Sequence, residues 1–180
     1  MRPSAGLGAP SVEAVERGFP WLVLGWFGLQ AALRVAAPGG LGIDEAEQRV
    51  MAQALEIGYG PQPPLYTWLQ AGLFAVTGPG KLGLALLKHA LLAAGVLGVW
   101  WIARRVTGSA RAAAVAGLSM AFLPQVVWES LRSLTHTPLA VAATVAAAAL
   151  ALEARARPGP GRGALLGLAL GAALLAKLNA

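Results

Sequence analysis

Five apolar runs, separated by short polar segments, are the feature that most limits what this chain can fold into. They cover residues 19–37, 82–102, 112–127, 138–152 and 164–180. An α-helix rises 1.5 Å per residue, so about 20 apolar residues cross the roughly 30 Å of hydrocarbon in a bilayer. A soluble domain usually carries about 25% charged residues, whereas this chain has 12%. The sequence therefore predicts an all-α fold, a polytopic transmembrane helical bundle of about five spans.

The same composition excludes several other classes of protein. An apolar content of 57% is too high for a disordered chain. The absence of cysteine excludes a disulfide framework and thiolate metal sites. The net charge is +6, but the basic residues stand at the ends of apolar runs and form no contiguous stripe. We therefore expect the lipid bilayer as a partner and no nucleic acid.

The placement of the basic residues predicts the orientation of the bundle. With the N-terminus in the cytoplasm, eight arginines fall on the cytoplasmic side: Arg2, Arg17, Arg104, Arg105, Arg111, Arg155, Arg157 and Arg162. Such an excess is typical of the cytoplasmic face of a membrane protein. Residues 1–18 are then a cytoplasmic tail and 38–80 the first extracytoplasmic loop. A cleavable signal peptide ending near residue 37 is the alternative, and it leaves the loop on the same side.

The first outer loop, 38–80, is expected to contain two short interfacial helices. One begins at Asp44 and has apolar residues on one face and charged residues largely opposite, as in a helix lying at a membrane surface. Asp44 as the N-cap and Glu47 at the third helical position would form a capping box. A Gly- and Pro-rich turn leads into the second helix, 65–76, which Tyr66 and Trp68 are suited to anchor at the interface.

Three ionisable residues near the outer membrane face are candidates for chemistry. Asp44 is the only aspartate in the chain, and a carboxylate at that height could accept a proton from a hydroxyl or an amine. Lys88 and His89 interrupt the second span, where ionisable groups are costly and often functional. The structural alternatives are helix capping by Asp44, snorkelling of Lys88 to the headgroups and a neutral, hydrogen-bonded His89.

A polar loop between the third and fourth spans adds Glu129, Arg132 and His136 to the same side of the membrane. Near Asp44 they would supply a carboxylate, a cation and an imidazole to one extracytoplasmic pocket. The sequence contains no Walker loop, nucleophile elbow or HExxH motif. His89 and His136 lack the spacing of paired metal ligands, so no metal or other cofactor is expected.

Two segments of the first outer loop resemble a known family. Asp44-Glu45-Ala46 followed by the stretch 60–69, with its Pro63-Pro64-Leu65 turn, resembles bacterial membrane glycosyltransferases of the GT-C fold. The most similar group is family 39, which includes protein O-mannosyltransferases and aminoarabinose transferases of lipid A. Residues 129–139 are similar to the family's loop between spans three and four, and 174–180 to its fifth span. The resemblance covers residues 19–180 as the N-terminal part of a longer glycosyltransferase domain.

The resemblance implies an activity and a set of site residues. Such enzymes transfer a sugar, with inversion, from a polyprenyl-phosphate donor to a glycan, lipid or protein acceptor outside the bacterial inner membrane. Asp44 would be the catalytic base, with Glu45 beside it. The substrate-binding residues would be Arg49, Gln62, Tyr66, Lys88, Glu129, Arg132 and His136, of which Arg132 and Lys88 would hold the phosphate. Gln62 and His136 depart from the family, where many members carry a basic residue and an aspartate.

A membrane transporter and a non-catalytic membrane scaffold are the alternative functions. Transporters favour sites near the membrane midplane, on broken helices related by internal repeats. This sequence shows no internal repeat, and its polar residues cluster at the outer edge. The pattern favours the transferase.

Overall fold

The computed structural model describes residues 11–124, 126 and 135–177, and these form helices joined by turns. The helices are α1 (Val12–Ala36), α2 (Ile43–Met51), α3 (Leu65–Thr77), α4 (Lys81–Thr107), α5 (Ala110–Ser119), the 3-10 helix η1 (Met120–Phe122), α7 (His136–Ala156) and α8 (Pro160–Ala176). The described segments contain no strand, only one isolated bridge between Tyr59 and Gln62. The predicted all-α class is confirmed.

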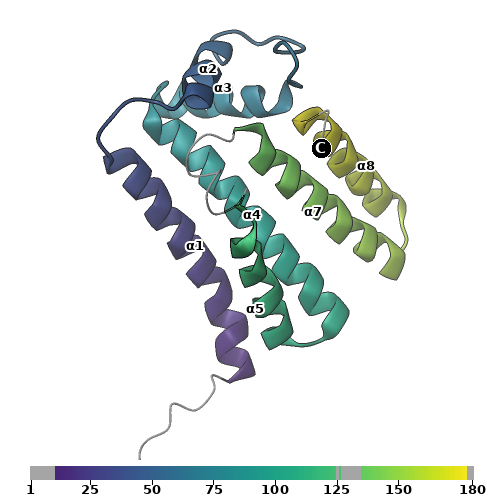
Figure 1. Cartoon of the computed structure of the whole chain (residues 1–180). Helices are drawn as coiled ribbons and strands as arrows, with labels where there is room; N and C mark the ends of the chain where they lie inside the picture. The colour runs from purple at the N-terminus through teal and green to yellow at the C-terminus, as the bar shows by residue number, and fades with distance from the viewer. Residues whose placement is uncertain (1–10, 125, 127–134, 178–180) are drawn as a thin grey trace, which may run out of the picture.

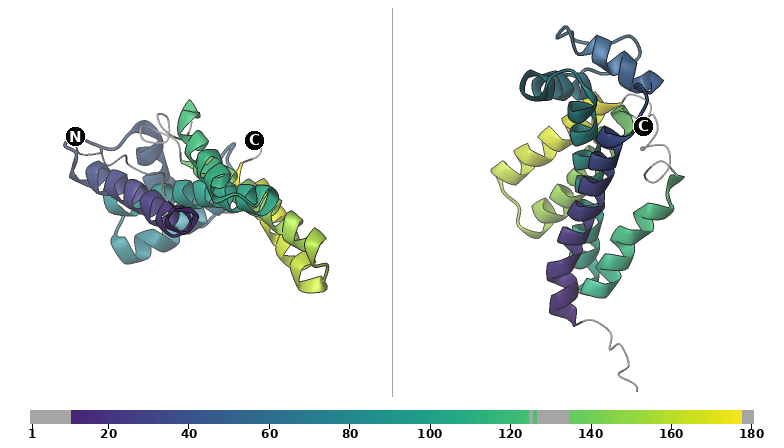
Figure 2. Two further views of the ribbon diagram at one scale, coloured as in Figure 1. Left: turned by 90° about the horizontal axis from the view of Figure 1, so that it is seen from below. Right: turned by 90° about the vertical axis from the view of Figure 1, so that its left-hand side faces the viewer.

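The long helices form a bundle, and the two helices of the first loop lie across one end of it (Figure 1). Helix α4 is central and packs against α1, α5 and α7, while α8 packs against α7. The right-hand view of Figure 2 shows α2 and α3 at the same end of the bundle. The loop therefore caps the bundle at the ends of α1, α4, α7 and α8.

Three helices, α1, α4 and α7, are long and apolar enough to cross a membrane. Helix α5 with η1, and helix α8, are also apolar but shorter. The predicted third span, 112–127, is interrupted at Leu123, because η1 ends at Phe122 and Leu123 is extended. Leu123 precedes Pro124, and a proline disfavours helical geometry in the residue before it. Helix α1, in contrast, begins at Val12, before the apolar run, with Ser11 accepting a hydrogen bond from the Ala14 amide.

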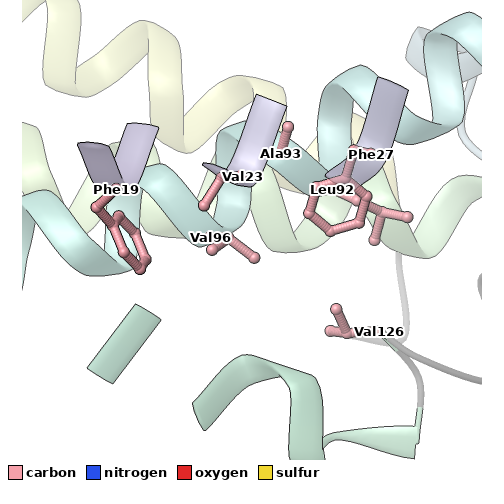
Figure 3. Close-up of a cluster of buried hydrophobic side chains, with 7 residues drawn as sticks. All are labelled: Phe19, Val23, Phe27, Leu92, Ala93, Val96 and Val126. Atoms are coloured by element: carbon pink, nitrogen blue, oxygen red, sulfur yellow. The ribbon is translucent and has the colours of Figure 1, made fainter. Parts of the chain in front are cut away.

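A row of side chains on α1 holds that helix against α4. Phe19, Val23 and Phe27 recur every four residues and therefore lie on one helical face. They are buried with Leu92, Ala93 and Val96 of α4 and with Val126 (Figure 3). Phe19 also stacks on Trp100, with ring centroids 5.7 Å apart. This core fixes how α1 and α4 pack along the middle of the bundle and toward the end remote from α2.

Two ion pairs tie helices together at the end remote from α2 and α3. Arg104 of α4 pairs with Glu16 of α1, and Arg105 of α4 pairs with Glu153 of α7. The start of α1 and the last turns of α4 and α7 therefore share one end of the bundle.

Close approach of α4 and α7 depends on Gly98. A Cβ atom at this position would lie 2.4 Å from Cγ1 of Val145. We expect Gly98→Ala to lower stability by about 1–3 kcal/mol, because overpacking forces the helices apart. Thermal unfolding in detergent measures the effect. Gly167→Ala in α8 is the matched control, since nothing in the described chain lies within 4 Å of its Cβ position. An equal loss in both variants would contradict the proposed packing role.

Candidate active site

Helix α2 meets the rest of the protein through its polar face. Its buried residues are Glu45 and Gln48, whereas Ile43 and Val50 are 86% and 66% exposed. The Gln48 amide donates a hydrogen bond to the Thr67 hydroxyl of α3 (2.9 Å). The helix is amphipathic, as the sequence predicts, and Ile43 and Val50 point away from the bundle, while Met51 is half-buried. An outward apolar face at this height suits contact with the membrane interface.

The predicted N-cap of this helix is wrong by two residues. Gly42, and not Asp44, is the N-cap, and the Glu45 carboxylate accepts a hydrogen bond from the Gly42 amide (3.0 Å). Glu45 therefore takes the position expected for Glu47. The physical reason is that cations from α1 and α4 hold the Glu45 carboxylate at the start of the helix. The Asp44 side chain has no capping role.

Glu45 joins two spanning helices through a buried ionic cluster. Its carboxylate forms an ion pair with Arg34 at the end of α1, including a hydrogen bond from Nε (3.2 Å), and with Lys88 Nζ of α4 (3.3 Å). The side chains of Glu45 and Lys88 are 1% and 2% exposed. Lys88 lies about 10 Å along α4 from its first residue, at 1.5 Å per residue. The cluster thus lies below the end of the bundle that α2 and α3 cover.

The electrostatics of the cluster keep Glu45 ionised. Burial alone would raise the pKa of Glu45. The hydrogen bonds from Arg34 and the Gly42 amide, with the charges of Lys88 and Arg34, outweigh burial and hold the pKa below its ordinary value. A carboxylate fixed by two cations is a poor proton acceptor at neutral pH.

Asp44 differs from its neighbour in both burial and contacts. Its side chain is half-buried and makes no hydrogen bond or ion pair with any other described residue. It is still close enough to Lys88 for their charges to attract. Asp44 is therefore a partly exposed carboxylate within electrostatic range of a buried cation.

A second group of buried polar side chains lies between α3 and the bundle. The rings of Tyr66 and His136 are 5.0 Å apart and tilted by 45°. Burial, with the negative charge of Glu45, raises the pKa of the Tyr66 hydroxyl. Among the described residues, Tyr66 Oη, both polar atoms of the Gln70 amide and His136 Nε2 have no hydrogen-bond partner. Buried polar atoms are rarely left so, so this layer can bind water or a ligand's hydroxyl groups.

The other predicted site residues are not joined to these groups. Arg49 is exposed on α2, and Gln62 lies in the turn, where its backbone pairs with Tyr59 (3.0 and 3.1 Å). No side-chain contact in the described segments links either residue to the cluster. Glu129 and Arg132 lie outside the described residues.

Sequence reasoning missed Arg34, Gln48, Thr67 and Gln70. An arginine at the end of an apolar run commonly snorkels toward the headgroups, but the Arg34 guanidinium turns toward Glu45. The sequence does indicate this contact, because an arginine at the end of an apolar run is separated from an acidic pair by only a short turn. The roles of Gln48 and Gln70 depend on which faces of α2 and α3 are buried, and the sequence does not fix those faces.

Comparison with known proteins gives the family. A model described as "Dolichyl-phosphate-mannose-protein mannosyltransferase" matches residues 61–180. The chain belongs to this family. The expected resemblance to GT-C membrane glycosyltransferases is thereby confirmed. No solved structure matches the chain.

Two curated relatives, both from Rhizobium johnstonii, are named lipopolysaccharide core galacturonosyltransferases. RgtA is 37% identical over 158 residues, which cover 88% of this chain and 32% of that protein. RgtB is 35% identical over 170 residues, which cover 93% of this chain and 34% of that protein. The chain therefore spans about a third of the length of these relatives.

Proposed function

We propose that the full-length protein transfers a uronic acid from a polyprenyl-phosphate donor to a lipopolysaccharide-core acceptor, with inversion, outside the bacterial inner membrane. The observation that carries this proposal is a partly exposed carboxylate, Asp44, beside Glu45 in the chain, whose ion pairs with Arg34 and Lys88 hold two cations at one end of a membrane bundle. Membership of the mannosyltransferase family supports glycosyl transfer. The names of the two relatives support the sugar and the acceptor.

In the proposed reaction, Asp44 accepts the proton of the acceptor hydroxyl as its oxygen attacks the anomeric carbon. The bond from that carbon to the phosphate oxygen breaks on the opposite face, which inverts the configuration. Negative charge builds on the leaving phosphate, and Lys88 and Arg34 would stabilise it. We propose Arg132 as a further phosphate partner, and Tyr66 and His136 as hydrogen-bonding groups for the sugar.

An apolar groove along α1 is suited to the polyprenyl tail. It has a volume of about 570 Å³, lies between α1 and α5, and includes Trp21, Trp26, Leu118 and Gln30 in its lining. Gln30 is one helical turn from Arg34. A lipid in the groove would therefore reach the cations with its phosphate end.

A transfer assay tests the function. The full-length protein in vesicles is given polyprenyl-phosphate-linked galacturonic acid and a lipopolysaccharide-core acceptor. We expect labelled core glycan whose new linkage has the anomeric configuration opposite to that of the donor, as read by NMR. The nucleotide-linked sugar is the control and should give no product without the lipid. Transfer directly from the nucleotide sugar, or retention of configuration, would contradict the mechanism.

The proposed orientation is testable because these 180 residues contain no cysteine. Arg104, Arg105 and Arg155 lie at the end of the bundle remote from α2, and we propose that this end is cytoplasmic. An impermeant maleimide should label Glu47→Cys in intact cells and Ser109→Cys only after permeabilisation. Both positions are exposed. The reverse labelling would place the proposed site in the cytoplasm and remove the proposed function.

A further inference from the structure

In the ionic cluster under α2, two cations share direct contact with a single carboxylate, and Asp44 attracts Lys88 without contacting it. The two cations are Arg34 and Lys88, and the carboxylate is that of Glu45. Lys88 is almost completely buried, and a buried cation requires a nearby anion. The Arg34 guanidinium meets Glu45 through both Nε and Nη2. This two-point geometry is equally suited to a carboxylate and to a phosphate.

Helix α2 is held in place almost entirely by these polar contacts. Its fully buried side chains are those of Glu45 and Gln48, whereas Ile43 and Val50 face outward and Met51 is half-buried. Gln48 adds a single hydrogen bond to Thr67. Releasing α2 would therefore break ionic and hydrogen bonds but would expose little apolar surface from this helix. An anion that replaces Glu45 could compensate for the lost ionic contacts.

We propose that Arg34 and Lys88 form a binding site for a phosphate group, and that the Glu45 carboxylate masks this site until a phosphate displaces it. The inference rests on the proposed function in that the phosphate would belong to the lipid donor. Glu45 is then a residue that sets donor affinity, and not a second base. Its carboxylate occupies the place of the incoming anion, and α2 moves when that place is taken.

Substitution of Glu45 tests the mask. Glu45→Gln in the full-length protein removes the competing charge and nearly preserves side-chain shape. We expect the affinity for polyprenyl phosphate in vesicles to rise at least about tenfold, because coupling within close charge pairs is commonly this large. Glu47→Gln makes the same charge change on the exposed side of α2 and should leave the affinity unchanged. Equal affinity of Glu45→Gln and the wild type would overturn the proposal.

Two ligand controls identify the source of the phosphate. Polyprenol has the same tail without the phosphate and should bind both proteins equally. Inorganic phosphate tests whether the anion alone is sufficient. Tighter binding of polyprenyl phosphate or of inorganic phosphate by Glu45→Gln supports the proposal that Glu45 masks the site. The one whose affinity rises more is identified as the ligand. Tighter binding of polyprenol as well would show a loosened tail site and would overturn the proposal.

A second measurement is independent of the folding of Glu45→Gln. A nitroxide attached at Glu47→Cys reports the mobility of α2 while the ionic cluster stays intact. Polyprenyl phosphate should increase its mobility, and polyprenol should not. Unchanged mobility at saturating polyprenyl phosphate would show that α2 is not displaced. Sugar transfer by the wild type, measured in parallel, separates failure of the mask from failure of the transferase.

Discussion

Asp44→Asn should reduce sugar transfer by about 10²–10⁴-fold, the usual contribution of a general base. An amide cannot accept the acceptor's proton, although it has nearly the same shape as the carboxylate. Asp44 makes no hydrogen bond or ion pair within the described part of the chain, so we expect normal expression and thermal stability. The loss should therefore appear in kcat, with little change in donor binding. Steady-state transfer assays on the full-length protein measure both.

Glu47→Gln is the control for the charge of α2. Glu47 lies three residues further along the same helix and is exposed, so its neutralisation changes the local potential without touching the proposed base. Transfer by Glu47→Gln should stay within about twofold of the wild type, because exposed charges are screened by salt. Equal losses of sugar transfer in Asp44→Asn and Glu47→Gln would show that the loss comes from the changed surface charge of α2. Full activity of Asp44→Asn would remove Asp44 as the base.

The general architecture could be predicted from the sequence because bilayer thickness sets a length that apolar runs must match. The runs at 19–37 and 82–102 correspond to α1 and α4 for that reason. Helix ends were less predictable, since polar residues can extend a helix beyond the hydrocarbon. Residues 12–18 do so with an ion pair between Arg17 and Glu13. Amphipathicity likewise predicted α2 as a helix.

The site was only partly predictable, because its contacts join residues that are far apart in the sequence. Glu45 and Lys88 were both named as candidates, but their direct ion pair depends on how α2 lies over α4. The local rule of helix capping predicts that α2 begins at Asp44. The ion pairs of Glu45 with Arg34 and Lys88, which are distant in the sequence, override that rule. Of the two neighbouring acids, Glu45 is therefore ion-paired, whereas Asp44 forms no ion pair with the described residues. Nothing in the local sequence distinguishes them.

Lys88→Met should lower transfer efficiency by about 10²–10³-fold, comparable to the loss of one preorganised group that stabilises transition-state charge. Methionine has a similar length without the ammonium group, so the leaving phosphate loses one of its two proposed cations. The variant should also lose stability, because a buried ion pair that loses one partner leaves a charge incompletely compensated. Arg34 still pairs with Glu45 and limits that cost. Lys81→Met on the same helix is the control, since Lys81 bonds only to the Ala37 carbonyl among the described residues (2.8 Å).

A double variant separates stability from chemistry at Lys88. Combining Lys88→Met with Glu45→Gln removes one charge of each sign and leaves Arg34, whose side chain is 20% exposed and can reach water. Neutral replacement of a buried ion pair is often nearly free of cost in stability, so we expect the melting temperature to recover toward the wild type. Transfer should stay low, because neither change restores the cation. Recovery of transfer together with stability would show that Lys88 acts only by holding α2 in place.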